Sequence, residues 1–99
     1  MTEQYRQGDV FILRIDRIPD EAQPQYSPII VRGETTGHAH RLVGGEILRV
    51  ALTNLLYLAC TAQAQVVHED HATITLPPGL YEVRRQREYH PDEIRLVED

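Results

Sequence analysis

Apolar residues occur along the chain in short runs separated by turn-forming residues, and this pattern predicts strands. The run Val10–Ile15 follows Gly8-Asp9 and is typical of a buried first strand. Residues 18–28 contain three prolines and are expected to form a loop. Gly44-Gly45 is a two-residue hairpin signal. Further strands are therefore expected before and after it, at 29–32, 35–43 and 46–52.

The second half of the chain continues in the same way. Residues 54–64 have the Leu and Ala content of a short helix, but we favour a strand because the neighbouring segments are strands. The longest alternating segment, 80–89, follows the turn Pro77-Pro78-Gly79, and a helical turn can begin at Pro91. Two shorter strands are expected at 66–68 and 72–76.

These elements predict an all-β fold, a small barrel or sandwich of short, mainly antiparallel strands with a short C-terminal helical turn. The length of 99 residues predicts a single domain, residues 1–99, resembling a small β-barrel. Hydrophobic residues make up 41% of the chain and charged residues 25%, which is typical of a folded protein rather than a disordered one.

The charge balance limits the partners. A net charge of -5 argues against a protein that binds long DNA or RNA, since such a protein needs a broad basic face. The ten basic residues are all arginines, whose planar guanidinium groups suit phosphate or carboxylate. A small anionic ligand held by a few arginines therefore stays compatible with the acidic chain.

Cys60 is the single cysteine, so it cannot form an internal disulfide, and its apolar surroundings in the sequence predict a buried, inert thiol. The N-terminus lacks the apolar stretch of a signal peptide, and no segment is long and apolar enough to span a bilayer. We expect a cytoplasmic protein that does not bind membranes.

Four of the five histidines fall in two short clusters, Gly37-His38-Ala39-His40 and His68-Glu69-Asp70-His71. In an extended chain, residues two apart point to the same face, so His38 and His40 are expected to project together. In the second cluster, an acidic residue between the histidines is suited to orient an imidazole and raise its basicity. The alternative for each cluster is a solvated loop whose histidines have no function.

The alternation of residues 80–89 places Arg85, Arg87 and Tyr89 on the face shared with Tyr81 and Val83, which we expect to point inward. Buried guanidinium groups need anionic partners, either an acidic residue of the second histidine cluster or a ligand phosphate. The alternative is an edge strand whose Arg/Glu pairs face solvent.

Two chemistries are compatible with these residues. In the first, no metal is needed: His38, His40, His68 and His71 supply the base and acid that cleave an RNA phosphodiester, while Arg85, Arg87 and Tyr89 bind the substrate. In the second, the same histidines hold Zn, Fe or Mn, in an arrangement similar in outline to cupins with Glu46 as the acidic ligand. A module that sequesters a nucleotide without chemistry is a third possibility, which would need the arginines but not the histidines.

The whole chain also resembles a set of small bacterial and phage proteins. The resemblance rests on five runs, which cover most of the length: 5–10, 33–40, 68–71, 77–81 and 85–89. We associate this group with viral ring nucleases, which destroy cyclic oligonucleotide signals of bacterial immunity. The resemblance implies a homodimer that cleaves cyclic oligoadenylates or related short RNA-like rings without a cofactor. The four catalytic histidines are an inference from the motifs and are not transferred from that group.

Overall fold

Short strands separated by turns build the protein, as the spacing of its apolar runs predicts. The structure is a computed structural model that describes residues 3–33 and 37–85. No helix in these two ranges is long and apolar enough to cross a membrane. Their ten strands are β1 (Gln4–Gln7), β2 (Val10–Ile15), β3 (Gln23–Gln25), β4 (Ile29–Arg32), β5 (Ala39–Val43), β6 (Glu46–Val50), β7 (Leu55–Cys60), β8 (Ala64–Val67), β9 (Ile74–Leu76) and β10 (Gly79–Arg85).

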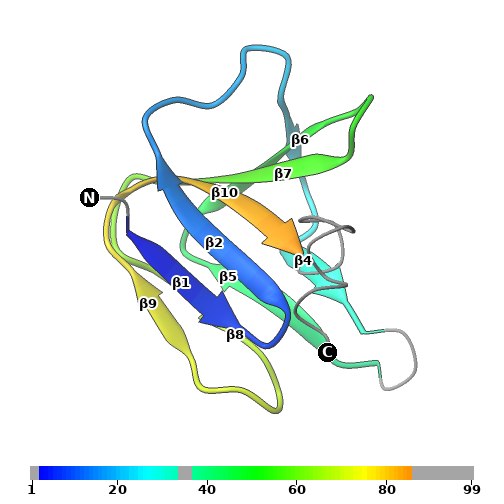
Figure 1. Ribbon diagram of the computed structural model, residues 1–99, viewed down its shortest axis with the longest axis vertical. Helices are drawn as coiled ribbons and strands as arrows, with labels where there is room; N and C mark the ends of the chain where they lie inside the picture. The colour runs from blue at the N-terminus through cyan, green and yellow to red at the C-terminus, as the bar shows by residue number, and fades with distance from the viewer. Residues whose placement is uncertain (1–2, 34–36, 86–99) are drawn as a thin grey trace, which may run out of the picture.

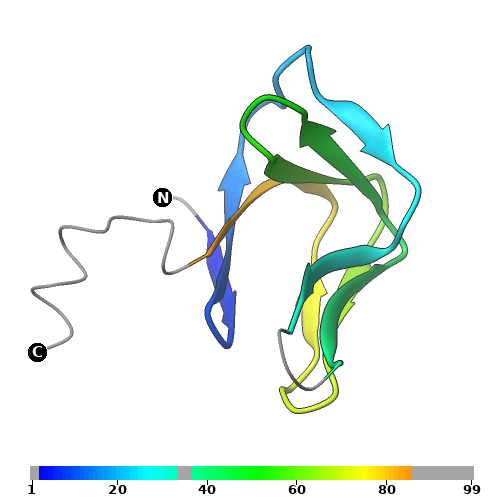
Figure 2. The ribbon, with the colours of Figure 1, turned by 90° about the vertical axis from the view of Figure 1, so that its right-hand side faces the viewer.

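The strands form two antiparallel sheets, one with the order β1-β2-β10-β7-β6-β3 and the other with the order β4-β5-β8-β9. Figure 1 labels the strands, and Figure 2 shows the blue β1–β2 pair on one side of the molecule and the green to yellow strands β5, β8 and β9 on the other. The all-β fold class is thus confirmed. Over the described residues the sheets do not close into a barrel, so the fold is sandwich-like.

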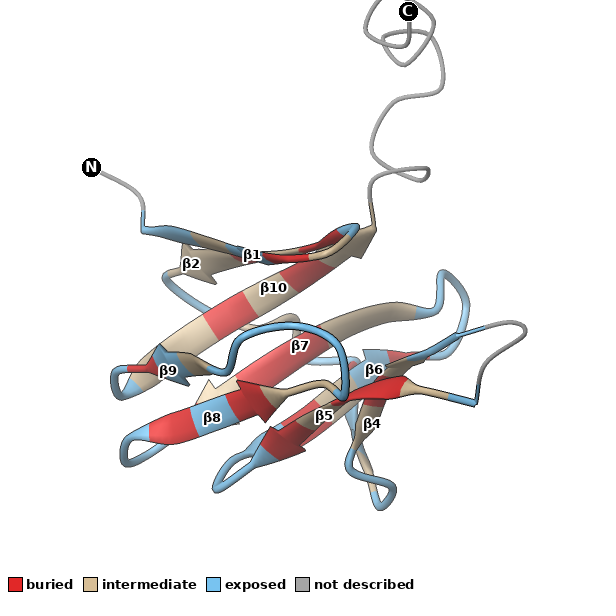
Figure 3. Ribbon diagram, turned by 90° about the horizontal axis from the view of Figure 1, so that it is seen from below, coloured by how far each residue is buried: buried red, intermediate tan, exposed pale blue. Residues whose placement is uncertain are grey.

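The core lies between the sheets, where buried residues from both layers meet (Figure 3). Val10 and Ile12 of β2 are fully buried beside Tyr81 of β10, and Val66 of β8 approaches from the opposite sheet. The Tyr81 hydroxyl donates a hydrogen bond to the Pro77 carbonyl at 2.6 Å, which satisfies the polar end of this large side chain. The inward face predicted for Tyr81 is therefore confirmed.

Gly44-Gly45 is not a hairpin, and that prediction is wrong. β5 pairs with β4 and β8, whereas β6 pairs with β7 and β3, so the chain passes from one sheet to the other at these glycines. Gly44 has a φ of +92°, a backbone conformation that residues with a side chain rarely adopt. A Cβ on Gly45 would lie 3.0 Å from Leu42 Cδ2 and 3.1 Å from Cys60 Sγ. Glycine is thus required here for a crossing between layers.

Other strand predictions are mostly confirmed: the segment 54–64 contains β7, and the described part of 80–89 lies in β10, whereas residues 86–89 lie outside the described residues. Two elements differ. β1 was not expected because its sequence, Gln-Tyr-Arg-Gln, has no apolar alternation; it pairs instead along the edge of β2. β3 falls inside the predicted loop 18–28, where Pro24 is tolerated because the strand lies at a sheet edge. The helical turn expected at Pro91 lies outside the described residues.

Cys60 ends β7 and is buried in the core, as the sequence predicts. Burial raises the pKa of its thiol, since the charged thiolate is disfavoured away from water. The side chain therefore acts as a small apolar group beside Gly45.

We predict that Gly45→Ala lowers the free energy of unfolding by about 1–3 kcal/mol, because the added methyl overpacks the crossing between sheets. Urea denaturation measures this change. Shrinking the neighbour with Cys60→Ala should relieve part of the clash, so the double variant should lose less stability than the sum of the single variants. Strictly additive losses would contradict the assigned contact.

Candidate functional site

The two histidine clusters meet at one end of the sandwich. His40 lies in β5, His38 precedes this strand, and His68 and His71 lie in the loop from β8 to β9. Because β5 pairs with β8, with Arg41 opposite Val67, the two clusters become neighbours. The ring centroid of His68 is 4.3 Å from that of His40, 4.7 Å from that of His71 and 5.9 Å from that of His38. His68 is therefore the centre of a compact group of four imidazoles.

Gln7 fixes the buried side of this cluster. Its side-chain amide nitrogen donates to the carbonyls of Val66 and Ala72 at 3.1 and 2.9 Å. Both carbonyls only accept, so the amide oxygen must face His40, whose Nδ1 lies 2.7 Å away. His40 Nδ1 then carries the proton, and the lone pair of the neutral ring is on Nε2. Gln7 and His40 are the buried polar pair, only 3% and 6% exposed.

His40 is held in its neutral form. Burial lowers its pKa to about 4, and the neighbouring His68 and His71 rings and the Arg85 guanidinium act in the same direction, against the opposing effect of Asp9. At neutral pH the ring is therefore an uncharged support for His68 rather than a charge in the core. Its burial means that a ligand reaches the other imidazoles first.

Asp70 sets the tautomers of two neutral rings at once. Its carboxylate lies 2.6 Å from His38 Nδ1, so this nitrogen donates and Nε2 is the basic atom of the neutral ring. Its backbone N–H donates to His68 Nδ1 at 3.0 Å, so the neutral His68 ring carries its hydrogen on Nε2. The sequence predicted that an acidic residue of this cluster orients an imidazole, and Asp70 does so for His38.

Glu69, the other acidic residue of the second histidine cluster, joins two segments of the chain instead of orienting an imidazole. It accepts the Ala39 backbone N–H at 3.1 Å and an Arg41 hydrogen bond at 3.0 Å, and so joins the loop to β5. Hydrogen bonds from backbone N–H groups and from Arg41 lower the pKa of Glu69 to about 2. Glu69 is thus ionised at neutral pH and secures the loop that carries His68 and His71.

The turn between β1 and β2 closes another side of the cluster. Gly8, with a φ of +63°, lies so near His71 that a Cβ there would be 2.9 Å from His71 Nε2. Figure 1 shows this turn and the β8–β9 loop together in the lower part of the molecule. His71 is exposed, so it lies between this turn and solvent.

Arg85 reaches the same region from the end of β10. It lies on the inward face with Tyr81 and Val83, as predicted, and its side chain is 23% exposed. The predicted internal partner was a carboxylate of the second histidine cluster; the acidic neighbour is instead Asp9 of the β1–β2 turn, 3.9 Å from Arg85 Nη2. Arg87 and Tyr89, the other predicted substrate-binding residues, lie outside the described residues.

A metal centre would need several side chains with converging donor atoms. Within residues 3–33 and 37–85, no group of three or more His, Cys, Asp or Glu side chains is placed to hold a metal ion. His68 Nδ1 already accepts a backbone hydrogen bond, and Glu46, the acidic ligand of the cupin-like set, begins β6 in the other sheet. As arranged here, Nε2 of the neutral His38 ring is an acceptor and Nε2 of the neutral His68 ring is a donor.

Sequence reasoning missed Gln7 and Asp9 as parts of the site. Neither residue type suggests a site in isolation, and the polar β1 segment gave no strand signal. Both lie in the run of residues 5–10, one of the five runs that carry the resemblance to small bacterial and phage proteins. That run was the only available signal.

A small antiparallel sandwich with a four-histidine cluster at one end is the class that the fold and the site define. The chain belongs to the family described as a domain of unknown function, DUF8820, which matches residues 6–86. The matched region contains the four clustered histidines and Arg85, whereas Arg87 and Tyr89 follow it. No curated protein and no solved structure is significantly similar to the chain.

We predict that Gln7→Leu lowers the free energy of unfolding by about 2–4 kcal/mol, because two carbonyls and the His40 N–H lose a buried partner together. Gln4→Leu is the matched control, on the same strand but exposed, and should change stability by less than about 0.5 kcal/mol. Urea denaturation compares the two, and equal losses would contradict the role of Gln7.

The low pKa of His40 predicts a pH dependence of stability. Between pH 6.5 and about 4 the unfolded chain binds a proton at His40 that the folded chain does not, so stability is complete above this window and falls as the pH is lowered through it. The loss reaches at most about 3 kcal/mol. His40→Gln should flatten the stability profile in this window, and an unchanged slope would show that His40 is not held neutral by the fold.

Proposed function

We propose that the protein is a metal-independent phosphodiesterase that cleaves short RNA-like oligonucleotides, with cyclic oligoadenylates as the leading substrate class. The observation that carries the proposal is the packing of the His38 and His71 rings near the central His68 ring, with Asp70 bound to His38. Imidazoles can remove and supply protons near neutral pH, which cleavage of a ribose phosphodiester requires.

His38 is proposed as the general base. Asp70 orients its ring and stabilises the imidazolium that forms when Nε2 takes the proton of a ribose 2′-hydroxyl. The 2′-oxygen then attacks the adjacent phosphorus, the bond to the 5′-oxygen breaks, and a cyclic 2′,3′-phosphate is left. Because the 2′-hydroxyl is the nucleophile, DNA is not a substrate.

His71 is proposed as the acid that protonates the departing 5′-oxygen. Its ring centroid is 4.7 Å from that of His68, so it lies close to the ring that is proposed to hold the phosphate. His68 donates from Nε2 to a phosphoryl oxygen, while buried His40 positions its ring.

Arg85 is proposed to balance the charge that develops on the phosphoryl oxygens, with Arg87 and Tyr89 as further binding residues. The net charge of -5 favours a short or cyclic ligand over a long polymer. The proposal includes a homodimer, the state that the resemblance to ring nucleases implies, and a role against cyclic oligonucleotide immune signalling.

We predict that the purified protein cleaves cyclic oligoadenylates and that EDTA leaves the rate unchanged. Separation of the products by chromatography measures this. Loss of cleavage in EDTA with recovery in Zn or Mn would support a metalloenzyme instead. Tight binding of the ring without turnover would contradict catalysis and support a sequestering module.

We predict that His38→Ala lowers the cleavage rate by about 10²–10⁴ while ring binding is largely kept, because proton transfer contributes in the transition state. Asp70→Asn should cost about 10–100-fold, since it removes only the group that orients the base. Single-turnover kinetics measure both rates. Full activity in both variants would contradict the assignment of the base.

A further inference from the structure

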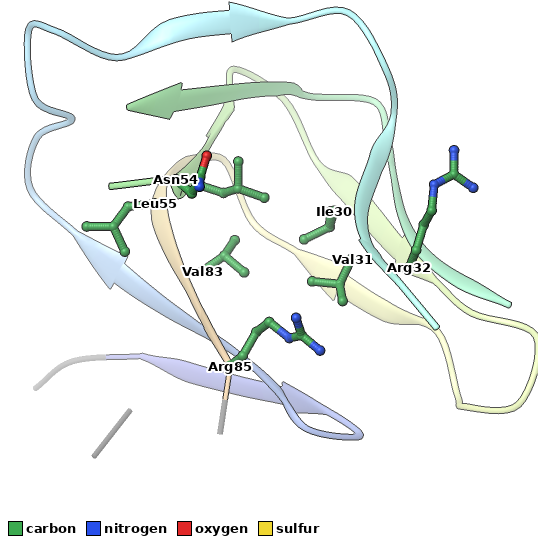
Figure 4. A pocket seen from close by; sticks show the side chains of 8 residues that line it. Ile30, Val31, Arg32, Asn54, Leu55, Val83 and Arg85 are labelled. Carbon is green, nitrogen blue, oxygen red and sulfur yellow. The ribbon is translucent and has the colours of Figure 1, made fainter. Parts of the chain in front are cut away.

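A concave surface lies next to β5, the strand that carries His40, because Val31 in its lining is opposite His40 in the β4–β5 pair. It is a cleft of about 380 Å³ where β4 faces the start of β7 and the end of β10 (Figure 4). Its walls are apolar, formed by Ile30 and Val31 from β4, Leu55 and Leu56 from β7, and Val83 from β10. Clefts of this size and lining are typical of small-molecule sites.

The polar groups of the cleft are cationic or neutral. Arg85 and Arg32 line it together with Asn54, and no carboxylate is among its described lining residues. Figure 4 shows Arg85 extending from β10 toward β4. In a chain with a net charge of -5, a cleft lined by the Arg85 guanidinium and bordered by Arg32 has the charge that complements an anionic ligand.

Arg85 is only partly satisfied by the protein. Its Nε atom is buried and has no hydrogen-bond partner within the described residues. Within the described residues its ion-pair partner is Asp9, with an oxygen 3.9 Å from Nη2, which is too far for a hydrogen bond. Because the side chain is 23% exposed, its terminal N–H groups rather than Nε are the donors suited to the oxygens of a phosphate.

Arg85 also connects the cleft to the histidine cluster. It lines the cleft, and its charge acts on His40 across the interior. Val31 of the cleft also lies opposite His40 in the β4–β5 pair, so a phosphate bound to Arg85 would lie on the side of the cleft that borders His40. A ligand that carries both an apolar ring system and a phosphate matches this site, since the ring system can contact the apolar side chains while the phosphate binds Arg85.

We propose that the cleft between β4 and β10 binds the nucleoside part of a nucleotide, with Arg85 holding the attached phosphate beside the histidines. The aliphatic walls cover the faces of the base, and the Asn54 amide hydrogen-bonds its edge. This inference rests on the proposed function, because it names the subsite that positions the phosphodiester for cleavage.

Adenosine 5′-monophosphate is the probe for this subsite. In ¹H–¹⁵N NMR titrations of the full chain, we expect it to shift the backbone amides of Ile30, Val31 and Leu56. Adenosine, ribose 5-phosphate and inorganic phosphate, each of which lacks one part of the ligand, should bind at least about tenfold more weakly. Equal binding of inorganic phosphate would overturn the role of the base, and equal binding of adenosine would overturn that of the phosphate.

Arg85→Gln should weaken binding of adenosine 5′-monophosphate by at least about tenfold. Arg84→Gln is the matched control, since it removes the same charge from the next residue of β10, where Arg84 pairs with Glu82 on the opposite face. Its affinity should equal that of the unmodified protein. If both variants lost the same affinity for adenosine 5′-monophosphate, the loss would come from the change in net charge, and the proposed subsite would be overturned.

The outcomes separate this inference from the proposed function. Shifts confined to the histidine loop, or no shifts, would overturn the subsite even if rings are cleaved. If the cleft binds the nucleotide but no ring is cleaved, the subsite is supported and the phosphodiesterase is not.

Discussion

The side chain of Gln7 is the constraint on which the site depends. It comes from the edge strand of the larger sheet and hydrogen-bonds to β8, to the loop after β8 and to β5, all in the smaller sheet or its loops. One buried amide thus fixes the position of the β1–β2 turn, the tautomer of His40 and the start of the histidine loop. Because a buried amide is costly when it lacks partners, these three features stay in place together or are lost together.

The loop of residues 68–71 uses its two acidic side chains for different tasks. Glu69 secures the loop to β5 through a backbone amide and Arg41, whereas Asp70 acts on His38 and His68. The four clustered histidines also differ in burial and in their access to a ligand. His40 is buried and neutral, while the exposed and half-buried rings around it are the ones available to a ligand.

The sequence predicted what depends on local pattern. Alternation in β10 placed Tyr81 and Val83 in the core, and the spacing of apolar runs predicted most strands, because one-sided burial leaves a period of two. It could not predict which strands pair. Gly44-Gly45 therefore predicted a hairpin, although the chain passes from one sheet to the other there. The meeting of the histidine clusters was a hypothesis that only the pairing of β5 with β8 could decide, and Gln7 and Asp9 contribute through contacts distant in sequence.

Cys60 gives this sandwich a built-in reporter of its own opening. The thiol is the single one in the chain, lies in the core against the glycine crossing and is disfavoured as a thiolate by burial. A reagent that modifies thiols therefore reacts with Cys60 only when the fold opens and exposes the side chain. The rate of modification under native conditions would measure how often the two sheets part, without any added label or denaturant.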